Sequence, residues 1–232
     1  MSAYDAIVFD YDGTLFDTRA AIAHCLRRAF AQYRRPIPGH ECVQAAIKTG
    51  LPLPDTLIAL DGRLRADRRA LGNLVGTYRE IYLDEGTPLL QPFTGVLDTL
   101  QQLQAGGAKC VVVSNKGVAA IRRSLELSGV GRFIDLIFGD APGLPKKPDP
   151  AILIEHVLPR YEQLQKERTL IVGDTEIDIL FAKRSGASSC WASYGYGESA
   201  RCRRLDPDHE ISSIAALPAL LHSGRSRTLK LL

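Results

Sequence analysis

The sequence predicts an α/β protein in which a doubly wound parallel sheet carries an inserted α-helical domain. Short, continuous runs rich in valine and isoleucine recur along the chain, as the buried strands of parallel sheets do. Helical stretches separate the later runs, and this rhythm is typical of crossover connections between parallel strands. Residues 17–90 interrupt the rhythm, because they contain no strand-like run and their apolar residues follow a helical period.

The elements of the sheet domain are predicted in chain order. Strands are expected at residues 4–10 (YDAIVFD), 108–114 (AKCVVVS), 133–140 (FIDLIFGD), 168–174 (RTLIVGD) and 188–194 (SSCWASY). Helices are expected at residues 94–107, 117–129, 149–164 and 174–186, and residues 209–221 suggest a small edge strand and a last helix. The tail, residues 222–232, carries little signal, and we expect it to be loose.

The interrupting segment is predicted to be a separate helical domain. Ile22, Leu26 and Phe30 stand at i, i+4 and i+8, which predicts an amphipathic helix over residues 17–33. Further helices are expected at residues 54–60 and 69–86, and the second border falls in the proline-rich stretch TPLLQPFTG. We therefore expect a discontinuous sheet domain, residues 1–16 and 91–232, and a helical domain, residues 17–90.

The composition is that of an ordinary globular protein and excludes two classes of partner. The 232 residues are 45% hydrophobic and 24% charged, with a formal net charge of +3. That charge is too small, and the arginine pairs too scattered, to indicate nucleic-acid binding. No apolar run reaches the roughly 18–20 residues that a membrane span needs. The first residues lack the basic region and cleavage-like segment of a signal peptide, so we expect none.

The cysteines indicate a reducing compartment. The chain has five of them, an odd number, and they show neither CxxC spacing nor a histidine at metal-ligand spacing. Reduced thiols in a cytoplasm fit this pattern best, so we expect a cytoplasmic protein.

Polar and charged residues gather where the predicted strands end. Ligands of doubly wound sheets bind at the carboxyl ends of the strands, so these side chains should converge on one edge. Acids, a hydroxyl and an amine in one place are what a phosphate site with a divalent metal requires. The residues are Asp10, Asp12, Ser114, Asn115, Lys116, Lys146, Lys147, Asp174 and Asp178.

Asp10 and Asp12 form the most informative pair. An Asp-Gly pair such as Asp12–Gly13 is also a good turn former. An EF-hand calcium loop does not fit, because the glycine comes too early, a strand leads in, and position twelve is Ala21 rather than glutamate. In a catalytic pair, one carboxylate would be the nucleophile and the other a general acid/base, and the two would need different pKa values.

The second acidic pair, Asp174 and Asp178, allows two interpretations. Either residue suits the positive end of the following helix, and Asp174 is a good N-cap residue. Alternatively, Asp174 would be a metal ligand that offsets repulsion within the acidic cluster. Magnesium favours oxygen ligands, and the strand ends carry no histidine or cysteine that would indicate zinc.

Ser114 and Lys147 are weak signals by themselves, since strands often end in serine and most lysines are solvated. A hydroxyl and the following backbone N–H can bind a phosphoryl oxygen. Pro148 and Pro150 stiffen the backbone before a helix and would hold Lys147 in place. A fixed cation there can neutralise charge on a transferring phosphoryl group.

Four motifs together resemble the haloacid dehalogenase superfamily, and within it the phosphoglycolate phosphatase-like branch. They match in order, and the helical insert stands where that branch carries its cap domain. The resemblance covers nearly the whole chain apart from the tail. The motifs are DYDGTLFD (residues 10–17), VVVSN (111–115), KPDP (147–150) and GDTEID (173–178).

The resemblance implies a magnesium-dependent phosphatase that hydrolyses a small phosphate monoester, phosphoglycolate-like, through an aspartyl-phosphate. Asp10 would attack phosphorus, and Asp12 would protonate the leaving oxygen and later activate water. Mg²⁺ would be held by the carboxylates of Asp10 and Asp174 and by the backbone carbonyl of Asp12, with Asp178 in support. The partner would be a small phosphorylated metabolite, with neither nucleic acid nor membrane involved.

The resemblance also assigns the phosphate-binding groups. Ser114, the Asn115 N–H and Lys147 would hold the phosphoryl oxygens. Gly13 belongs to the same substrate site and lets the chain turn sharply behind it. The sequence does not reveal the oligomeric state.

Several alternatives stay open. A phosphomutase keeps an acid at the position of Asp12, although SNK (114–116) and SYGYG (193–197) look more like the phosphatase branch. A pyrophosphatase or nucleotidase of the same superfamily is also compatible. A non-catalytic phospho-receiver-like signalling module uses a similar set of residues, but such modules are about half this length and lack the insert. True dehalogenases and phosphonate-cleaving members lack the acid two residues after the nucleophile.

The resemblance implies that specificity for the leaving group comes from the helical domain, although no decisive motif is visible there. The stretch IKTGLPLPDTL, residues 47–57, is the first place to look. Lys48 and Thr49 could reach the catalytic residues from there, or Lys48 could simply be solvated.

Overall fold

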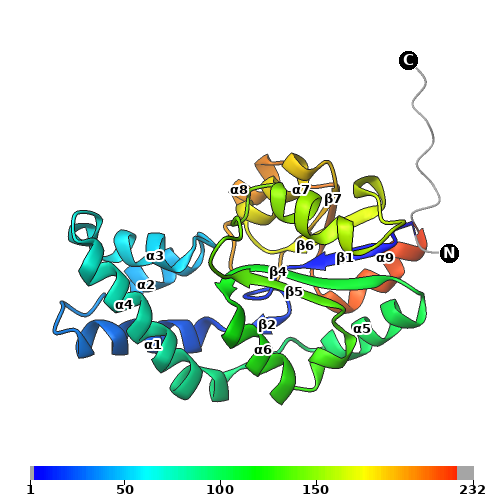
Figure 1. The fold of residues 1–232 in the computed structure, drawn as a ribbon. Coiled ribbons are helices and arrows are strands. Elements are labelled where there is room, and N and C mark those ends of the chain that lie inside the picture. The colour runs from blue at the N-terminus through cyan, green and yellow to red at the C-terminus, as the bar shows by residue number, and fades with distance from the viewer. Residues whose placement is uncertain (1–2, 224–232) are drawn as a thin grey trace.

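The structure, a computed structural model, describes residues 3–223 and consists of two parts. A sheet with helices on both faces forms one part, and a helical domain lies beyond one end of the sheet (Figure 1). The expectation for the tail falls almost entirely on residues 224–232, which lie outside the described residues. Within the described residues, no helix combines the length and apolar character needed to cross a membrane.

The sheet has six parallel strands in the order β5-β4-β1-β6-β7-β8, which confirms the doubly wound prediction and the small edge strand. The chain builds outward from β1 to β4 and β5 on one side, then to β6, β7 and β8 on the other. The switch point therefore lies at β1, where ligands of such sheets bind. The strands are β1 (Ala6–Phe9), β4 (Lys109–Gly117), β5 (Leu136–Asp140), β6 (Thr169–Gly173), β7 (Ser188–Ala192) and β8 (His209–Ile211).

Helices cover both faces because the buried strands present apolar side chains on both sides. In β1, Ile7 and Phe9 pack in one cluster with residues of α5, α6 and α9, whereas Val8 packs on the opposite face with residues of α7 and η5. The α-helices are α5 (Val96–Ala105), α6 (Val118–Leu127), α7 (Glu176–Ser185), α8 (Ser199–Arg204) and α9 (Leu217–Ser223).

The remaining helical segments of the sheet domain are short. The predicted helix at residues 149–164 is a π-helical turn followed by a 3₁₀ turn, and it ends earlier than predicted, at Arg160. The turns are η4 (Val130–Phe133), η5 (Ile152–Val157), η6 (Leu158–Arg160), η7 (Lys166–Arg168) and η8 (Ile214–Ala216).

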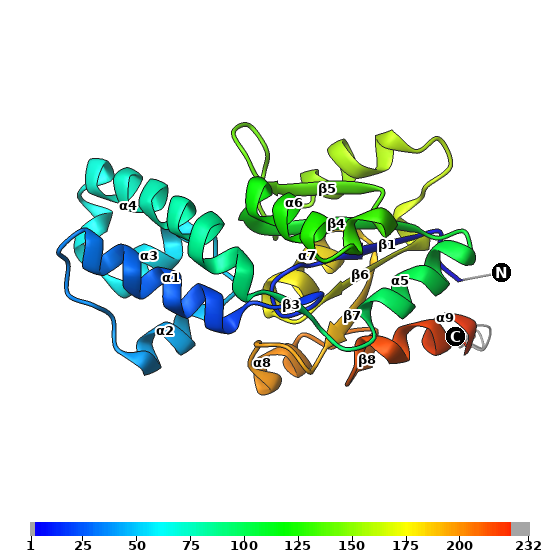
Figure 2. The ribbon, with the colours of Figure 1, turned by 90° about the horizontal axis from the view of Figure 1, so that it is seen from below.

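The helical domain follows β1 and is built around two long helices. In Figures 1 and 2, α1 and α4 lie side by side, and their buried faces include Leu26 and Phe30 of α1 and Leu74 of α4. One helix, α2, was not expected from the sequence; it has eight residues, a glycine at its N-cap and no side-chain cap within the described residues. The segments are α1 (Arg19–Gln32), α2 (His40–Ile47), α3 (Leu53–Leu60), η1 (Gly62–Arg65), α4 (Arg68–Ile81), η2 (Tyr82–Gly86) and η3 (Thr87–Leu89).

A short ribbon joins the two chain segments that connect the parts. β2 (Phe16–Asp17) pairs antiparallel with β3 (Gln91–Pro92). No strand-like run was expected from about Asp17, yet Asp17 is the second residue of β2. The sequence does not reveal it, because a two-residue strand is too short to show an alternating pattern. The ribbon holds the entry and exit of the helical domain together.

The phenol of Tyr196 anchors the start of α1 to the sheet domain. Thr18, the N-cap residue, makes no side-chain cap hydrogen bond. Instead, the Tyr196 hydroxyl accepts hydrogen bonds from the N–H groups of Thr18 at 2.6 Å and Arg19 at 3.0 Å. It also donates to Asp17 Oδ1 at 2.9 Å. A residue from the far end of the chain thus satisfies the unpaired amides of this helix terminus.

Candidate active site

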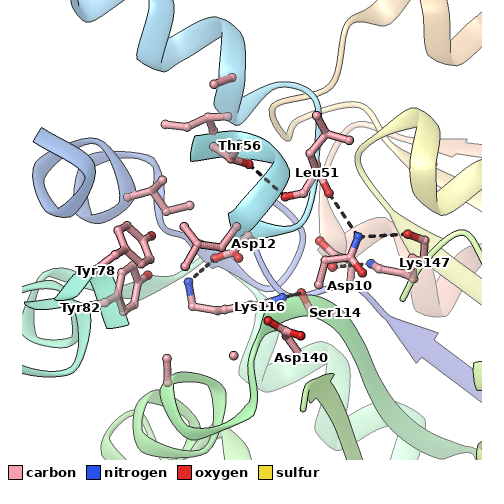
Figure 3. A pocket seen from close by; sticks show the side chains of 18 of the residues that line it. Asp10, Asp12, Leu51, Thr56, Tyr78, Tyr82, Ser114, Lys116, Asp140 and Lys147 are labelled. Atoms are coloured by element: carbon pink, nitrogen blue, oxygen red, sulfur yellow. Dashed lines mark hydrogen bonds and ion pairs between the residues drawn. The ribbon is translucent and has the colours of Figure 1, made fainter. Parts of the chain in front are cut away.

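A cavity of about 160 Å³ lies between the carboxyl ends of the strands and the helical domain (Figure 3). The sheet domain contributes charged and polar walls, and the helical domain contributes mainly apolar ones, among them Ile22, Leu26, Leu53, Tyr78 and Tyr82. Most of the residues singled out from the sequence meet here. Those that line the cavity are Asp10, Asp12, Ser114, Asn115, Lys116, Lys147 and Asp178.

Asp10 stands at the end of the central strand. Its backbone N–H donates to the Val172 carbonyl at 2.8 Å, which places its carboxylate at the switch point of the sheet. Burial raises the pKa of Asp10 to about 6, against the attraction of Lys147 and with a contribution from the neighbouring carboxylates of Asp178 and Asp12. The side chain therefore sits in a place where negative charge is costly.

Lys147 is the cation that contacts this buried carboxylate. Its Nζ donates to Asp10 Oδ1 and to Asp178 Oδ1, each at 2.6 Å. Burial alone would lower the pKa of Lys147, but the two carboxylates raise it overall, so the ammonium stays charged. The neighbouring Lys146 points elsewhere and pairs with Asp140 at 3.0 Å.

Asp174 and Asp178 have different surroundings. The interpretation of Asp174 as a helix cap is wrong, because Thr175 is the N-cap residue of α7. Asp178 completes a capping box, in which its Oδ2 accepts from the Thr175 N–H at 3.0 Å and from the Thr175 hydroxyl at 2.8 Å. Asp174 is fully buried, and its Oδ2 accepts from the Tyr196 N–H at 2.6 Å.

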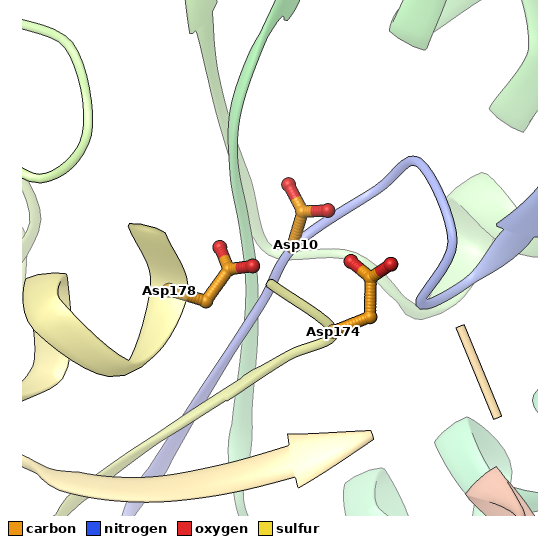
Figure 4. Close-up of side chains that lie close together, drawn as sticks. All are labelled: Asp10, Asp174 and Asp178. Atoms are coloured by element: carbon orange, nitrogen blue, oxygen red, sulfur yellow. The ribbon is translucent and has the colours of Figure 1, made fainter. Parts of the chain in front are cut away.

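Three carboxylates form a cluster that fits a divalent cation. Asp10, Asp174 and Asp178 each offer an oxygen within 4.8 Å of the others (Figure 4). Within residues 3–223, Lys147 is the cation hydrogen-bonded to this cluster, and it offsets one of three charges. Burial raises the pKa of Asp174 well above its usual value, with repulsion from Asp10 and Asp178 as further causes.

The hydrogen bonds of the three carboxylates indicate which of their oxygens are available to a cation. Both oxygens of Asp178 are engaged, one by Lys147 and one by Thr175, so this residue supports the cluster from behind. Among residues 3–223, no hydrogen bond engages Asp10 Oδ2, and Asp174 Oδ1 has one long contact, from the Thr14 hydroxyl at 3.4 Å. An all-oxygen site of this kind suits a hard divalent cation better than zinc.

Gly13 is needed where the chain turns behind the cluster. Its φ is +82°, and a Cβ at this position would lie 2.3 Å from Asp174 Oδ2. Gly13 is buried and lies outside the cavity wall. The close approach of Asp174 is therefore a second reason, besides the turn, why glycine is needed at position 13.

The end of β4 carries three consecutive polar residues. Ser114 is buried at the cavity wall, and its hydroxyl accepts from the Lys116 N–H at 3.4 Å. The Asn115 side chain donates to the carbonyl of Lys147 at 3.2 Å and to that of Gly50, in the helical domain, at 3.4 Å. Lys116 Nζ donates to Asp12 Oδ1 at 2.9 Å.

Sequence reasoning assigned no role to Lys116. The available signal is its position, because it directly follows Ser114 and Asn115 at the same strand end. What the sequence cannot show is that its side chain turns toward Asp12.

The stretch at residues 47–57 forms part of the cavity wall. Ile47, Gly50, Leu51, Leu53 and Thr56 line it. The expectation that Lys48 and Thr49 reach the catalytic residues is wrong, since neither lines the cavity. Lys48 is exposed, as its alternative interpretation held, and the Thr49 hydroxyl bonds to the Ala46 carbonyl at 2.6 Å. Arg79 of α4 and Asp140 of β5 also line the cavity, and their ion pair at 2.5 Å links the two parts.

The buried carboxylates predict how the stability of the metal-free protein depends on pH. A carboxyl group whose pKa is raised in the folded state stabilises the folded protein while it is protonated. This contribution to the free energy of unfolding is fully present below the unfolded pKa of about 3.9, and it is lost as the pH rises through the folded pKa. For Asp10 that loss is complete once the pH exceeds about 6. With a chelator present, the free energy of unfolding should fall by roughly 1–3 kcal/mol between pH 5 and pH 8.

Urea denaturation at the two pH values measures this difference. Asp174→Asn, which removes one repelling charge, should flatten the dependence. Excess Mg²⁺ at pH 8 should restore stability, because a ligand that binds only the folded state stabilises it. Stability that rises between pH 5 and pH 8 in the chelated protein would contradict the charge assignment.

Comparison with known proteins points to one family. Residues 7–192 match the family model described as haloacid dehalogenase-like hydrolase. The chain is similar to a phosphoglycolate phosphatase of Vibrio parahaemolyticus, 30% identical over 221 residues that cover 91% of this chain and 93% of that protein. It is also similar to the pyrophosphatase PpaX of Halalkalibacterium halodurans, 29% identical over 216 residues that cover 92% of this chain and 94% of that protein.

Solved structures with a similar fold were also found. A haloacid dehalogenase-like family hydrolase from Streptococcus pneumoniae superposes with a TM-score of 0.81 at 25% identity, covering 95% of this chain and 99% of that chain. A predicted phosphoglycolate phosphatase from Haemophilus somnus gives a TM-score of 0.79 at 23% identity, with 95% and 99% covered. The second likeness, at this identity, concerns the fold alone.

Proposed function

Since the chain belongs to the haloacid dehalogenase-like hydrolases and is a phosphatase of that family, we propose that it hydrolyses a small, phosphoglycolate-like phosphate monoester with magnesium. The observation that carries the proposal is the Asp10 carboxylate at the switch point of the sheet. It lies against Lys147 and within the three-carboxylate cluster, and it lines a cavity that also holds Asp12. The remote alternative of a non-catalytic phospho-receiver-like module does not fit a hydrolase with this insert.

Asp10 is the proposed nucleophile. Lys147 binds its Oδ1, and among the described residues no hydrogen bond engages Oδ2, so one oxygen remains to attack phosphorus. The attack forms an aspartyl-phosphate and releases the alcohol. Burial and the neighbouring acids already make the charged form of Asp10 unfavourable. Little solvation free energy is therefore lost when this carboxylate becomes an acyl phosphate.

Asp12 is the proposed general acid/base. It is partly exposed at the cavity wall, two residues beyond Asp10 and on the side of the helical domain. From there it would give a proton to the leaving oxygen and then take one from the water that hydrolyses the aspartyl-phosphate. One residue serves both steps because the leaving oxygen and the incoming water occupy the same side of phosphorus.

Three groups of the sheet domain are proposed to hold the phosphoryl oxygens. They are the Ser114 hydroxyl, the Asn115 N–H and the Lys147 ammonium. Ser114 and Lys147 are both buried, so their donors are oriented before the substrate arrives.

The cation proposed for the carboxylate cluster is Mg²⁺. The Asp10 and Asp174 carboxylates and the Asp12 carbonyl would hold it, with Asp178 in support. When bound, it supplies positive charge to the phosphoryl group that is being transferred. The three-carboxylate cluster supports this assignment, as does Asp174 Oδ1, whose contact within residues 3–223 is a long one of 3.4 Å from the Thr14 hydroxyl.

The helical domain is proposed to act as a cap. We assign residues 17–90 to it and residues 1–16 and 91–232 to the core. The ribbon of β2 and β3 joins them, and the Arg79–Asp140 ion pair also crosses between them. Closure of such a cap excludes bulk water from the aspartyl-phosphate and limits access to small substrates. The five free cysteines favour a reducing compartment, and we propose the cytoplasm.

A substrate screen tests the proposal. The purified protein with Mg²⁺ should release phosphate from one or more small esters or anhydrides among phosphoglycolate, sugar phosphates, nucleotides and pyrophosphate. Transfer of the phosphoryl group between positions of a sugar, without net release, would favour the phosphomutase alternative. No release from any of these compounds would refute the proposed function.

The metal assignment gives a prediction of its own. Asp174→Asn should raise the Mg²⁺ concentration needed for half-maximal activity by about 10- to 100-fold, because it removes a charged ligand from the buried cluster. The KM for the phosphate ester should change much less. Titration of Mg²⁺ at saturating ester, and of the ester at saturating Mg²⁺, separates the two effects. Full activity in excess chelator would contradict the assignment.

A further inference from the structure

Lys116 places a buried ammonium on the cavity wall, on the side of the leaving group. Its side chain is 8% exposed, although it extends from the open end of β4. Nζ donates to Asp12 Oδ1 at 2.9 Å and lies 3.8 Å from the centre of the Tyr82 ring. An ammonium has three donors, and the contacts within residues 3–223 account for one hydrogen bond. The remaining donors are available to a ligand.

Tyr82 brings a second unused group to the same place. It begins η2 in the helical domain, is 1% exposed, and lines the cavity beside Lys116 (Figure 3). Among the described residues its hydroxyl has no hydrogen-bond partner. Buried tyrosine hydroxyls are normally paired, since an unpaired one costs free energy without a gain in packing. A ligand oxygen would satisfy it.

The surrounding wall strengthens any charge interaction at this point. Ile22, Leu26, Tyr78 and Leu83 line the cavity on this side and are apolar or aromatic. Low polarity around an ammonium increases its attraction for an anion. The other cations on the described wall are Arg79, which pairs with Asp140, and Lys147, which pairs with Asp10 and Asp178.

The position of Lys116 relates it to the leaving group rather than to the phosphoryl group. The proposed acid/base Asp12 must come within about 2.6–3.2 Å of the leaving oxygen. Lys116 contacts that same carboxylate, whereas Lys147 contacts the nucleophile. An anionic group one or two bonds beyond the leaving oxygen would therefore reach Lys116.

We propose that Lys116 and Tyr82 form a subsite for an anionic group on the leaving part of the substrate. The preferred substrates are then small phosphate esters or anhydrides that carry a carboxylate or a second phosphate next to the scissile bond. This inference rests on the proposed function. Because Lys116 comes from the core and Tyr82 from the helical domain, the subsite exists only while the two parts are together.

The test compares two nearly isosteric esters, 2-phosphoglycolate and ethyl phosphate, which differ by the carboxylate. The wild-type protein should prefer 2-phosphoglycolate by at least about 100-fold in kcat/KM, the scale of a buried charge-assisted hydrogen bond. Lys116→Met should remove most of this preference, because kcat/KM for 2-phosphoglycolate should fall much further than kcat/KM for ethyl phosphate. Tyr82→Phe, which removes only the hydroxyl, should reduce the preference about fivefold. Pyrophosphate in the same assay shows whether a phosphate can replace the carboxylate.

Lys146→Met is the matched control, because it neutralises a neighbouring lysine that pairs with Asp140 and should leave the preference unchanged. Equal loss on both esters in Lys116→Met would show that Lys116 acts only through Asp12, and it would overturn the inference while leaving the phosphatase intact. A wild type that hydrolyses both esters equally would overturn it without any variant. Absence of phosphate release from every ester by the wild type would instead refute the proposed function.

Discussion

Asp10→Asn is expected to abolish turnover, with a loss of at least about 10⁴-fold in kcat for any phosphate ester that the protein hydrolyses. An amide cannot attack phosphorus in place of the carboxylate, and loss of a nucleophile removes the covalent route altogether. Phosphate release under saturating Mg²⁺ measures the loss. Rapid acid quenching followed by peptide mapping should find phosphate on Asp10 in the wild type and on no residue of the variant.

The loss should not come from unfolding. Asp10 is one of three buried carboxylates that face a single lysine, so removing its charge relieves repulsion. The metal-free variant should therefore unfold at the same temperature as the wild type or at a higher one. Asp98→Asn, an exposed acid on α5, is the matched control and should retain full activity. A phosphorylated peptide that lacks Asp10 would overturn the assignment of the nucleophile.

Asp12→Asn is expected to slow both chemical steps, each by about 10²- to 10⁴-fold, the usual contribution of a general acid or base. An asparagine can neither protonate the leaving oxygen nor activate water. Single-turnover measurements with a rapid quench separate formation of the aspartyl-phosphate from its hydrolysis. Esters with good leaving groups, such as p-nitrophenyl phosphate, need less help from an acid, so their first step should slow less.

The combination of effects identifies the role of Asp12. With p-nitrophenyl phosphate, the variant should accumulate the aspartyl-phosphate, because the first step is partly spared and the second is not. Normal hydrolysis of this intermediate in Asp12→Asn would mean that another group activates water. Lys116 would then need a different explanation for its contact with Asp12.

The sheet and the position of the site could be predicted because their signals are local. A strand buried on both faces appears as consecutive apolar residues, as in residues 6–9 and 110–113. The carboxyl ends of parallel strands meet at one edge, so Asp10, Ser114 and Asp174 could be placed together without knowing any side-chain contact. Two segments were not predicted: the two residues of β2 are too few to show a period, and α2 begins after a glycine N-cap that gives no side-chain capping signal.

By itself, the sequence determined the fold class, the helical insert and the acids that meet at the strand ends. Only the tertiary structure decided the individual partners. Lys116 and Asp12 lie 104 positions apart, and Tyr196 is 178 positions from Thr18, whose N–H it binds. Such pairs depend on how separate elements cross in space and on which rotamer each side chain adopts there. Local periodicity reveals neither the crossing of the elements nor the rotamers. It arises from burial, and a side chain is buried equally whichever distant residue it contacts.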